Sequence, residues 1–236
     1  VVVNGTEGEP ASGKDAFLLG HDPDLVIDGA LAAAEAVGAR EVVLAVSRGS
    51  TALARAREAV GRRAAAALPV RLTIAEPPDR FVAGEESALV HWINGGPATP
   101  TLSPPRPSER GVGRRPTLVQ NAETMAHIGL IARHGADWFR RVGTTAEPGS
   151  MLVSLGGAVR TPGIHEIALG TPLGEVLDLA GGADGEIAGI LVGGYFGTWL
   201  RGDDPLGLPF SAAGLRPAGG SPGAGAVVVL PHGCCG

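Results

Sequence analysis

The first 76 residues alternate between short apolar runs and longer segments of helical periodicity, and this order limits what the chain can fold into. Short runs made mainly of apolar residues are typical of strands buried in a sheet. They lie at 1–3, 41–46 and 70–76. Helical spacing covers 24–37, which Gly38 ends, and 51–66, which Ser50 can cap. Strand, helix, strand, helix, strand predicts an α/β fold with a parallel sheet, which we assign to residues 1–143.

The second half of the chain has a different pattern. Residues 144–150 read as a linker. Strand-like runs then occur at 150–159, 163–169, 188–194, 197–200 and 224–231, with one short helical segment at 171–182. Two strands, a helix and further strands predict a small β-grasp unit, which we assign to residues 149–233.

Composition narrows the class of protein. The chain has 236 residues, 44% of them hydrophobic and 18% charged, which is a globular profile. The net charge of -5 and the lack of a long basic run argue against a nucleic-acid partner. No apolar stretch approaches the roughly 20 residues of a membrane helix, so we expect no membrane insertion. Two adjacent cysteines cannot form a disulfide framework, which favours a reducing, cytoplasmic setting.

Polar residues gather where the predicted strands end. In parallel sheets, ligands bind beyond the carboxyl ends of the strands. The first such loop reads NGTEGEP, with Glu7 and Glu9 one residue apart, and a later one contains Gly84, Glu85 and Glu86. Each has a plainer interpretation: the first pair suits a solvated turn, and the second pair suits the first turn of a helix, whose dipole favours acids.

Two other groups are candidate sites. Gln120 and Asn121, followed by Glu123 and Thr124, suit a helix entry. His232, Cys234 and Cys235 resemble metal ligands, but adjacent cysteines rarely bind one ion together and only three soft ligands are present. We therefore predict no metal site there.

Taken in order, the motifs resemble those of the NADH-binding flavoprotein subunit of respiratory complex I, the F subunit. The matching segments are NGTEGEP at 4–10 with KD at 14–15, AGEESAL at 83–89, RRPTLVQNAET at 114–124, and the β-grasp sequence GAVRTPGIHEIALGTPLGEVLDLAGG at 157–182. The resemblance extends over nearly the whole chain. It implies a Rossmann-like domain that binds FMN and NADH, followed by a soluble ligand-binding β-grasp domain.

The resemblance also implies roles for individual residues. Glu7 and Glu86 would be catalytic, on the nicotinamide side of the flavin. The cofactor contacts would come from Asn4, Thr6, Glu7, Gly8, Glu9, Phe81, Gly84, Glu85, Glu86, Gln120, Asn121 and Thr124. Of these, Gln120, Asn121 and Thr124 would meet the flavin phosphate. Such a protein accepts hydride from NAD(P)H onto FMN and passes electrons to an iron–sulfur cluster, toward quinone or another acceptor.

Several positions depart from the family pattern. Thr6 stands for an Asp, Gln120 for an Asn, Ser103 for a Lys and Arg106 for the Phe that stacks on adenine. The Gly-rich loop expected before residue 1 and the cysteine segment expected after Gly236 lie outside the sequence, so we expect a chain truncated at both ends. A [4Fe–4S] cluster would then belong only to a longer natural chain, since it needs four thiolates.

Two other functions remain open at this point. The chain could be a non-catalytic scaffold homologue without flavin, or an FMN protein with a donor other than NADH. The expected partners are NAD(P)H and an electron-transfer subunit that carries iron–sulfur clusters. The expected location is cytoplasmic, with attachment to the inner face of the membrane through a complex.

Overall fold

The computed structural model describes residues 1–66, 68–102, 104–202 and 204–234. Its contacts divide the chain into two compact units. The first consists of Val1–Gly8 and Asp15–Gly135, and the second of Glu9–Lys14 and Ala136–Gly236. The chain therefore leaves the first unit briefly, inside the loop that follows the first strand, before it returns and completes that unit.

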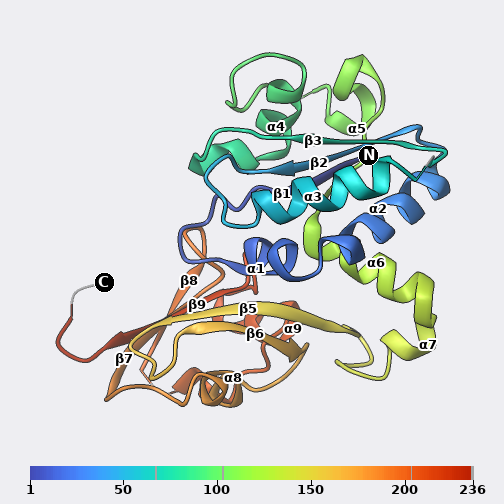
Figure 1. The fold of residues 1–236 in the computed structure, drawn as a ribbon. Helices are drawn as coiled ribbons and strands as arrows, with labels where there is room; N and C mark the ends of the chain where they lie inside the picture. Colours follow the sequence, from blue (N-terminus) through green and yellow to red (C-terminus); the bar gives the residue numbers. More distant parts are fainter. Residues whose placement is uncertain (67, 103, 203, 235–236) are drawn as a thin grey trace. The chain divides into compact units, whose positions relative to one another are not determined.

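A parallel four-stranded sheet forms the centre of the first unit (Figure 1). Its strands are β1 (Val2–Gly5), β2 (Glu41–Val46), β3 (Arg71–Ala75) and β4 (Val119–Asn121), in the order β3-β2-β1-β4. The predicted α/β fold with a parallel sheet is confirmed. The fourth strand was not predicted, because three residues with the sequence VQN carry no hydrophobic pattern.

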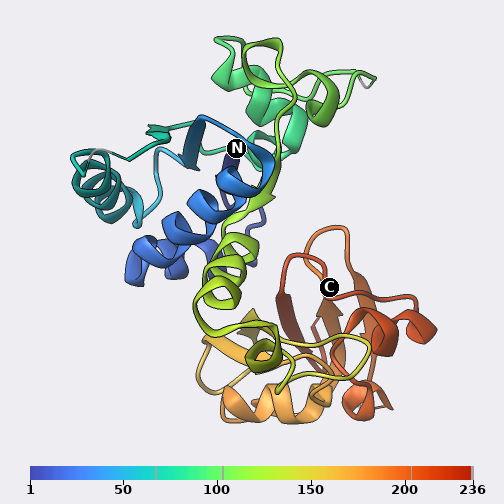
Figure 2. The ribbon, with the colours of Figure 1, turned by 90° about the vertical axis from the view of Figure 1, so that its right-hand side faces the viewer.

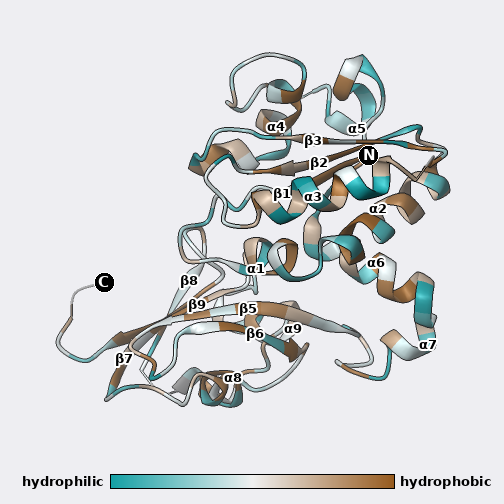
Figure 3. Ribbon diagram, viewed as in Figure 1, coloured by the Kyte–Doolittle hydropathy of each residue, from teal (hydrophilic) through white to brown (hydrophobic). Residues whose placement is uncertain are grey.

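The two faces of this sheet bury different side chains, as the alternation along a strand requires. Val3 and Leu44 face one hydrophobic cluster, which includes residues of α2, α3 and α6. Val2 and Val43 face a second cluster with Leu89 of α4. Figure 3 shows the hydrophobic strands between these layers and the more polar surface of α3. Because both faces are covered, the central strand β2 reads as an apolar run from Val42 to Val46.

The helices of this unit follow local signals in most places. They are α1 (Lys14–His21), α2 (Pro23–Val37), α3 (Leu53–Ala64), α4 (Glu86–Ile93), α5 (Pro107–Arg110) and α6 (Ala122–His134), with 3-10 turns η1 (Phe81–Gly84) and η2 (Val112–Arg114). Asp22 accepts a hydrogen bond from the Leu25 N–H at the start of α2, and Gly38 ends it at φ +69°.

Two of the predicted helix limits are wrong. The Ser50 hydroxyl accepts from the Ala52 N–H, 3.2 Å away, so it forms a turn before α3 and the helix begins only at Leu53. The sequence also predicts one helix through 128–143, but α6 ends at His134, because the next residue, Gly135, has a φ of +87° that a helix does not allow. A separate short helix, α7 (Ala136–Phe139), follows in the second unit.

Helices α2 and α6 cross in close backbone contact at two glycines. A Cβ atom built on Gly29 would lie only 1.6 Å from the Met125 carbonyl oxygen, and one on Gly129 would lie 2.9 Å from the Leu25 carbonyl oxygen. No side chain fits at Gly29 without moving a backbone. Both views of the unit show these helices side by side (Figures 1 and 2).

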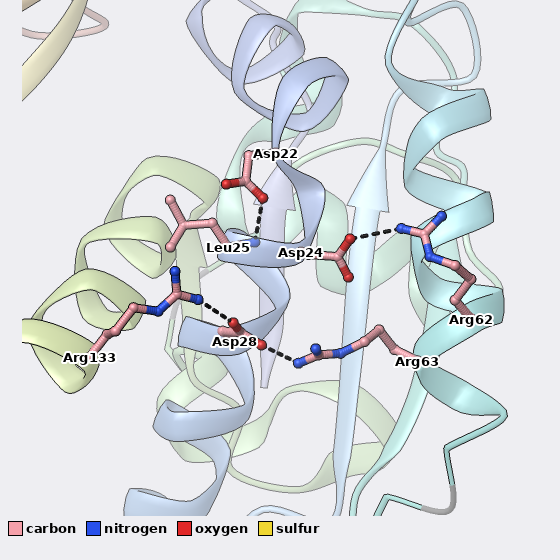
Figure 4. Close-up of polar contacts among 7 residues, drawn as sticks. All are labelled: Asp22, Asp24, Leu25, Asp28, Arg62, Arg63 and Arg133. Atoms are coloured by element: carbon pink, nitrogen blue, oxygen red, sulfur yellow. Dashed lines mark hydrogen bonds and ion pairs between the residues drawn. The ribbon is translucent and has the colours of Figure 1, made fainter.

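Ion pairs connect α2 with α3 and with α6 on their outer surfaces (Figure 4). Asp28 of α2 pairs with Arg63 of α3 through one carboxylate oxygen and with Arg133 of α6, at 2.9 Å, through the other. Asp24 pairs with Arg62 of α3 at 2.7 Å. Asp28 is half-buried, so its two pairs are less screened by water than the more exposed Asp24 pair.

The second unit contains a mixed five-stranded sheet in the order β6-β5-β9-β7-β8. The strands are β5 (Ser150–Gly157), β6 (Gly163–Ala168), β7 (Ile187–Val192), β8 (Thr198–Arg201) and β9 (Ala226–Pro231). Only β5 and β9 pair in parallel. Helices α8 (Leu173–Leu179) and α9 (Ala212–Leu215) and turns η3 (Asp204–Gly207) and η4 (Arg216–Ala218) complete it. Its core includes Phe210, Leu173 and Ile190.

The segment read as a linker forms a hydrogen-bonded turn in this unit. The Glu147 carboxylate accepts from the Ala212 N–H at 2.9 Å and the Ala213 N–H at 3.1 Å, at the start of α9. The Ser211 hydroxyl bonds to the same carboxylate, and together these bonds and the nearby Arg216 charge lower the pKa of Glu147. Leu169 donates its N–H to the Gly149 oxygen at 3.0 Å, which attaches the turn to the end of β6.

In the part of the chain that the structure describes, no helix has the length and hydropathy needed to cross a bilayer.

Candidate functional site

Asn4 is the centre of a polar network at the carboxyl end of β1. Its Nδ2 donates to the Gly84 oxygen at 2.7 Å, and its Oδ1 accepts from the N–H of Thr6 at 3.2 Å and from the Thr6 hydroxyl. Asn4 also lies directly beside Asn121 of β4 in the sheet register. The structure therefore brings four of the predicted site residues together, from three segments far apart in the sequence.

Two glycines of the predicted site occupy places where a side chain would collide with backbone. A Cβ on Gly84 would lie 2.8 Å from both the carbonyl and hydroxyl oxygens of Thr6. A Cβ on Gly8 would lie 2.2 Å from the Phe81 carbonyl oxygen. Gly8, Phe81, Gly84 and Thr6 thus form a close-packed wall in which the backbone itself provides the surface.

Glu85 and Glu86 have different surroundings although they are adjacent. Glu85 is the N-cap of α4, and its carboxylate accepts from the Ala88 N–H at 3.0 Å and the Ser87 hydroxyl at 2.5 Å. Partial burial opposes ionisation of Glu85, but the hydrogen bonds from Ser87 and Ala88 outweigh it and lower its pKa. Glu86 is exposed, and its carboxylate has no hydrogen bond or ion pair to any residue in the described ranges. Of the two, Glu86 is the carboxylate available to a ligand.

Glu7 holds the start of α1. Its two carboxylate oxygens accept from the N–H groups of Asp15 and Ala16, each at 3.1 Å. These are N–H groups that a helix cannot satisfy itself. The side chain is half-buried, so the loop after β1 is anchored to the next helix rather than solvated.

Asn121 caps α6 and joins it to α1. Its Oδ1 accepts from the Glu123 N–H at 3.0 Å, and its Nδ2 donates to the buried Asp15 carboxylate at 2.7 Å. Gln120 and Thr124, on either side, are exposed, and neither side chain has a hydrogen-bond partner in the described part of the chain. The sequence reasoning missed Asp15, although its place in the KD motif directly after the acidic loop was a usable signal.

Glu9 behaves differently from the rest of the predicted set. It belongs to the second unit, where its carboxylate accepts from the Tyr195 N–H at 2.7 Å and the Ala11 N–H at 3.2 Å. Gly194, in the turn after β7, has a φ of +91°, which favours glycine, and a Cβ there would also lie 2.6 Å from this carboxylate. Glu9 is therefore grouped with the second sheet, and the other predicted residues with the first.

Two hollows of the first unit lie away from this network. One of about 570 Å³ lies at the opposite, amino-terminal edge of the sheet and is lined in part by Val2, Arg40, Arg71 and Arg115. A smaller one of about 240 Å³ is lined in part by Ser87 and His91 of α4 and by Leu102, Pro105 and Arg110. None of the predicted site residues lines either of them.

Other residues singled out in the sequence lie away from the Asn4 network or outside the described residues. Ser103 and Cys235 are outside the described residues. Arg106 is the exposed N-cap of α5, and its N–H donates to Glu109 at 3.0 Å. Cys234 is exposed and free. Within the described ranges, no group of three or more His, Cys, Asp or Glu side chains could hold a metal ion.

Comparison with known proteins gives a consistent result. A model of the Nuo51 FMN-binding domain matches residues 1–130. The F subunit of the NADH-quinone oxidoreductase of Mycobacterium tuberculosis is 34% identical over the whole chain, which spans 56% of that protein. The alpha subunit of the NAD-reducing hydrogenase HoxS of Cupriavidus necator is 36% identical over 78% of this chain and 33% of its own length.

A solved structure shows the same likeness in three dimensions. The crystal structure of NAD+-reducing [NiFe]-hydrogenase in the air-oxidized state superposes with a TM-score of 0.88 and 33% identity, over 98% of this chain and 40% of that one. The chain thus spans little more than half of the mycobacterial relative and less of the hydrogenase chains. With more than half of its residues inside the family model, the chain belongs to the Nuo51 FMN-binding domain family.

Proposed function

We propose that this chain is the flavin-binding part of an NADH-oxidising flavoprotein. It accepts hydride from NAD(P)H onto FMN, and the electrons continue through an iron–sulfur partner subunit toward quinone or another acceptor. The observation that carries the proposal is the network of Asn4, Thr6, Gly84 and Asn121 at the carboxyl edge of the sheet. It lies inside the residues that match the FMN-binding family and where parallel sheets bind ligands.

The residues of the network suit the two ends of FMN. Gly8 packs directly against the Phe81 backbone and Gly84 against that of Thr6, and these close contacts would fix the shape of the flavin side. The start of α6, with the exposed Gln120 and Thr124, offers N–H and hydroxyl donors for a phosphate, which the helix dipole also favours. The chemistry of these donors fits the cofactor, and bound FMN would supply the acceptor for the hydride.

We group the site residues by the part of the ligands that each would contact. Asn4, Thr6, Gly8, Phe81 and Gly84 would shape the flavin surface. Gln120, Asn121 and Thr124 would hold the phosphate. Glu86, the unpaired carboxylate, would orient the nicotinamide of NAD(P)H, with Glu85 fixing the turn that presents it. We assign Glu7 to the nicotinamide side as the second catalytic residue, and we keep Glu9, which belongs to the second unit, as a proposed cofactor contact.

The wider assignments follow from the relatives and remain part of the proposal. The matched proteins include a subunit of NADH-quinone oxidoreductase and one of NAD-reducing hydrogenase, so we propose a cytoplasmic subunit of a redox complex at the inner face of the membrane. We propose the β-grasp fold for the second unit, with its mixed sheet and helix α8. The two cysteines of the sequence are too few for a [4Fe–4S] cluster, so no step is assigned to one here.

An FMN titration followed by quenching of flavin fluorescence tests the binding step. Stopped-flow reduction of the flavin by NADH, NADPH or reduced ferredoxin then identifies the donor. Glu86→Gln should slow reduction by the nicotinamide donor at least tenfold and leave FMN affinity within twofold. Glu35→Gln, which changes an exposed acid at the end of α2, is the matched control.

The outcomes separate the candidate functions. A chain that binds no FMN would be a scaffold homologue. A chain that binds FMN but is reduced only by ferredoxin would use a different donor, in keeping with Arg106 at the adenine-stacking position. An unchanged rate in Glu86→Gln would remove Glu86 from the site.

A further inference from the structure

Asp15 is a buried carboxylate that has no role in the proposed function. It is the second residue of α1, and only 4% of it is exposed. Burying a carboxylate costs free energy unless hydrogen bonds replace the lost water. One of these bonds comes from Asn121, 106 residues further along the chain, whose Nδ2 lies 2.7 Å from the Asp15 Oδ2.

That bond, together with a longer one from the same Nδ2 to the Asn4 carbonyl oxygen at 3.4 Å, fixes which way the Asn121 amide points. An amide presents a donor on one side and an acceptor on the other. With Nδ2 bound to Asp15, Oδ1 is directed to the Glu123 N–H, 3.0 Å away, and caps α6. A reversed amide would place its donors against the Glu123 N–H and its oxygen against the Asp15 carboxylate. Both contacts would be unfavourable, so Asp15, which makes the shorter of the two Nδ2 bonds, strengthens the capping orientation.

The same residue is fixed from the other side. The Asp15 N–H donates to the Glu7 carboxylate at 3.1 Å. Glu7, Asp15 and Asn121 therefore form a continuous series of hydrogen bonds from the loop after β1 to the first turn of α6. The ends of this series are the two regions to which we assign the nicotinamide side and the flavin phosphate.

We propose that Asp15 is a positioning residue, which orients Asn121 so that the start of α6 can bind the phosphate of FMN. This inference rests on the proposed function. It differs from a general role in stability because it concerns one end of the cofactor. Loss of Asp15 should weaken the binding of FMN while the binding of riboflavin, which lacks the phosphate, stays the same.

The test measures FMN and riboflavin affinities of the full chain by fluorescence quenching. Asp15→Ala removes the acceptor and should weaken FMN about tenfold, with riboflavin affinity within twofold. Asp15→Asn keeps an oxygen that can accept from Asn121 and should recover most of the lost affinity. Asp22→Ala removes the cap of α2, a comparable helix-start aspartate, and should lower the melting temperature without changing the ratio of the two affinities.

The results distinguish this inference from the function beneath it. If the unaltered chain binds neither flavin, the proposed function fails and the role of Asp15 fails with it. If it binds both equally, flavin binding stands and the phosphate role is wrong. If Asp15→Ala weakens both flavins equally or neither, Asp15 serves only the fold and the inference is overturned.

Discussion

The two sheets of this protein use their polar residues in different ways. In the parallel sheet, the carboxyl ends of β1 and β4 lie at one edge, and Asn4 and Asn121 meet there in register. In the mixed sheet most neighbours are antiparallel, so no edge collects the ends of all strands. The buried Ser154 of β5 instead accepts from the Gly13 N–H, and the buried Ser211 caps α9 by accepting from the Gly214 N–H. Strand direction thus determines which sheet can build a shared site.

The cores differ as well. The first unit fills its interior with small residues, and its helices approach until backbone touches backbone at Gly29. The second unit buries a large ring, Phe210, which is fully inaccessible. Added side-chain atoms should therefore destabilise the first unit more, and removed side-chain atoms should destabilise the second unit more. The following predictions test that contrast, beginning with the largest effect.

Phe210→Ala should destabilise the second unit by about 4 kcal/mol, because it deletes a fully buried ring and leaves a cavity. Phe17→Ala, in the first unit, removes a ring that is 40% exposed and should cost about 1 kcal/mol or less. Hydrogen exchange would measure both. For Phe210→Ala, protection should fall in β5–β9 and persist in β1–β4. An equal loss in both sheets would show that they unfold as one core.

Gly29→Ala should destabilise the first unit by about 3 kcal/mol, since one methyl group forces α2 away from the Met125 carbonyl. Gly61→Ala is the matched control in α3. Its new Cβ meets nothing within 4 Å, and alanine favours helix, so it should stabilise by about 0.5–1 kcal/mol. Denaturant unfolding would give both values. Two changes of the same sign would contradict the close crossing.

The smallest effect concerns pH. Glu85 and Glu147 both have a folded-state pKa below the ordinary 4.5. A lowered pKa means stability that is fully present above about 4.5 and is lost as the pH falls through the folded-state value. Melting temperatures measured from pH 6 to 3 should therefore fall more steeply for the unaltered chain than for Glu147→Gln. Parallel curves would show that the turn around Glu147 does not depend on its charge.

Much of the first sheet was predictable because its signal is local. Strands β1 and β2 contain apolar runs that are almost wholly buried, and β3 is mostly apolar but only partly buried. The short β4 could not be predicted, since it owes its existence to pairing with β1 rather than to its own residues. Likewise, the end of α6 depends on one glycine, Gly135, inside a sequence that otherwise favours a helix.

The sequence predicted the residue types of the candidate site better than the hydrogen bonds between them. Motifs pointed to Asn4, Gly84 and Asn121, and the structure joins them by hydrogen bonds or sheet register. The different surroundings of Glu85 and Glu86 depend on where α4 begins, and one residue of shift would exchange their roles. The bond between Asp15 and Asn121 connects positions that no local pattern relates.

The short excursion of Glu9–Lys14 into the second unit has a consequence for how this protein could have been assembled or divided. The chain passes between its two units three times, at 8–9, 14–15 and 135–136. A single cut after Gly135 would separate the second unit from residues 9–14. It would then lose the hydrogen bond from the Gly13 N–H to Ser154 and the one from the Tyr195 N–H to Glu9. The two units are therefore interleaved, and neither could have been exchanged as an independent module without the loop that follows β1.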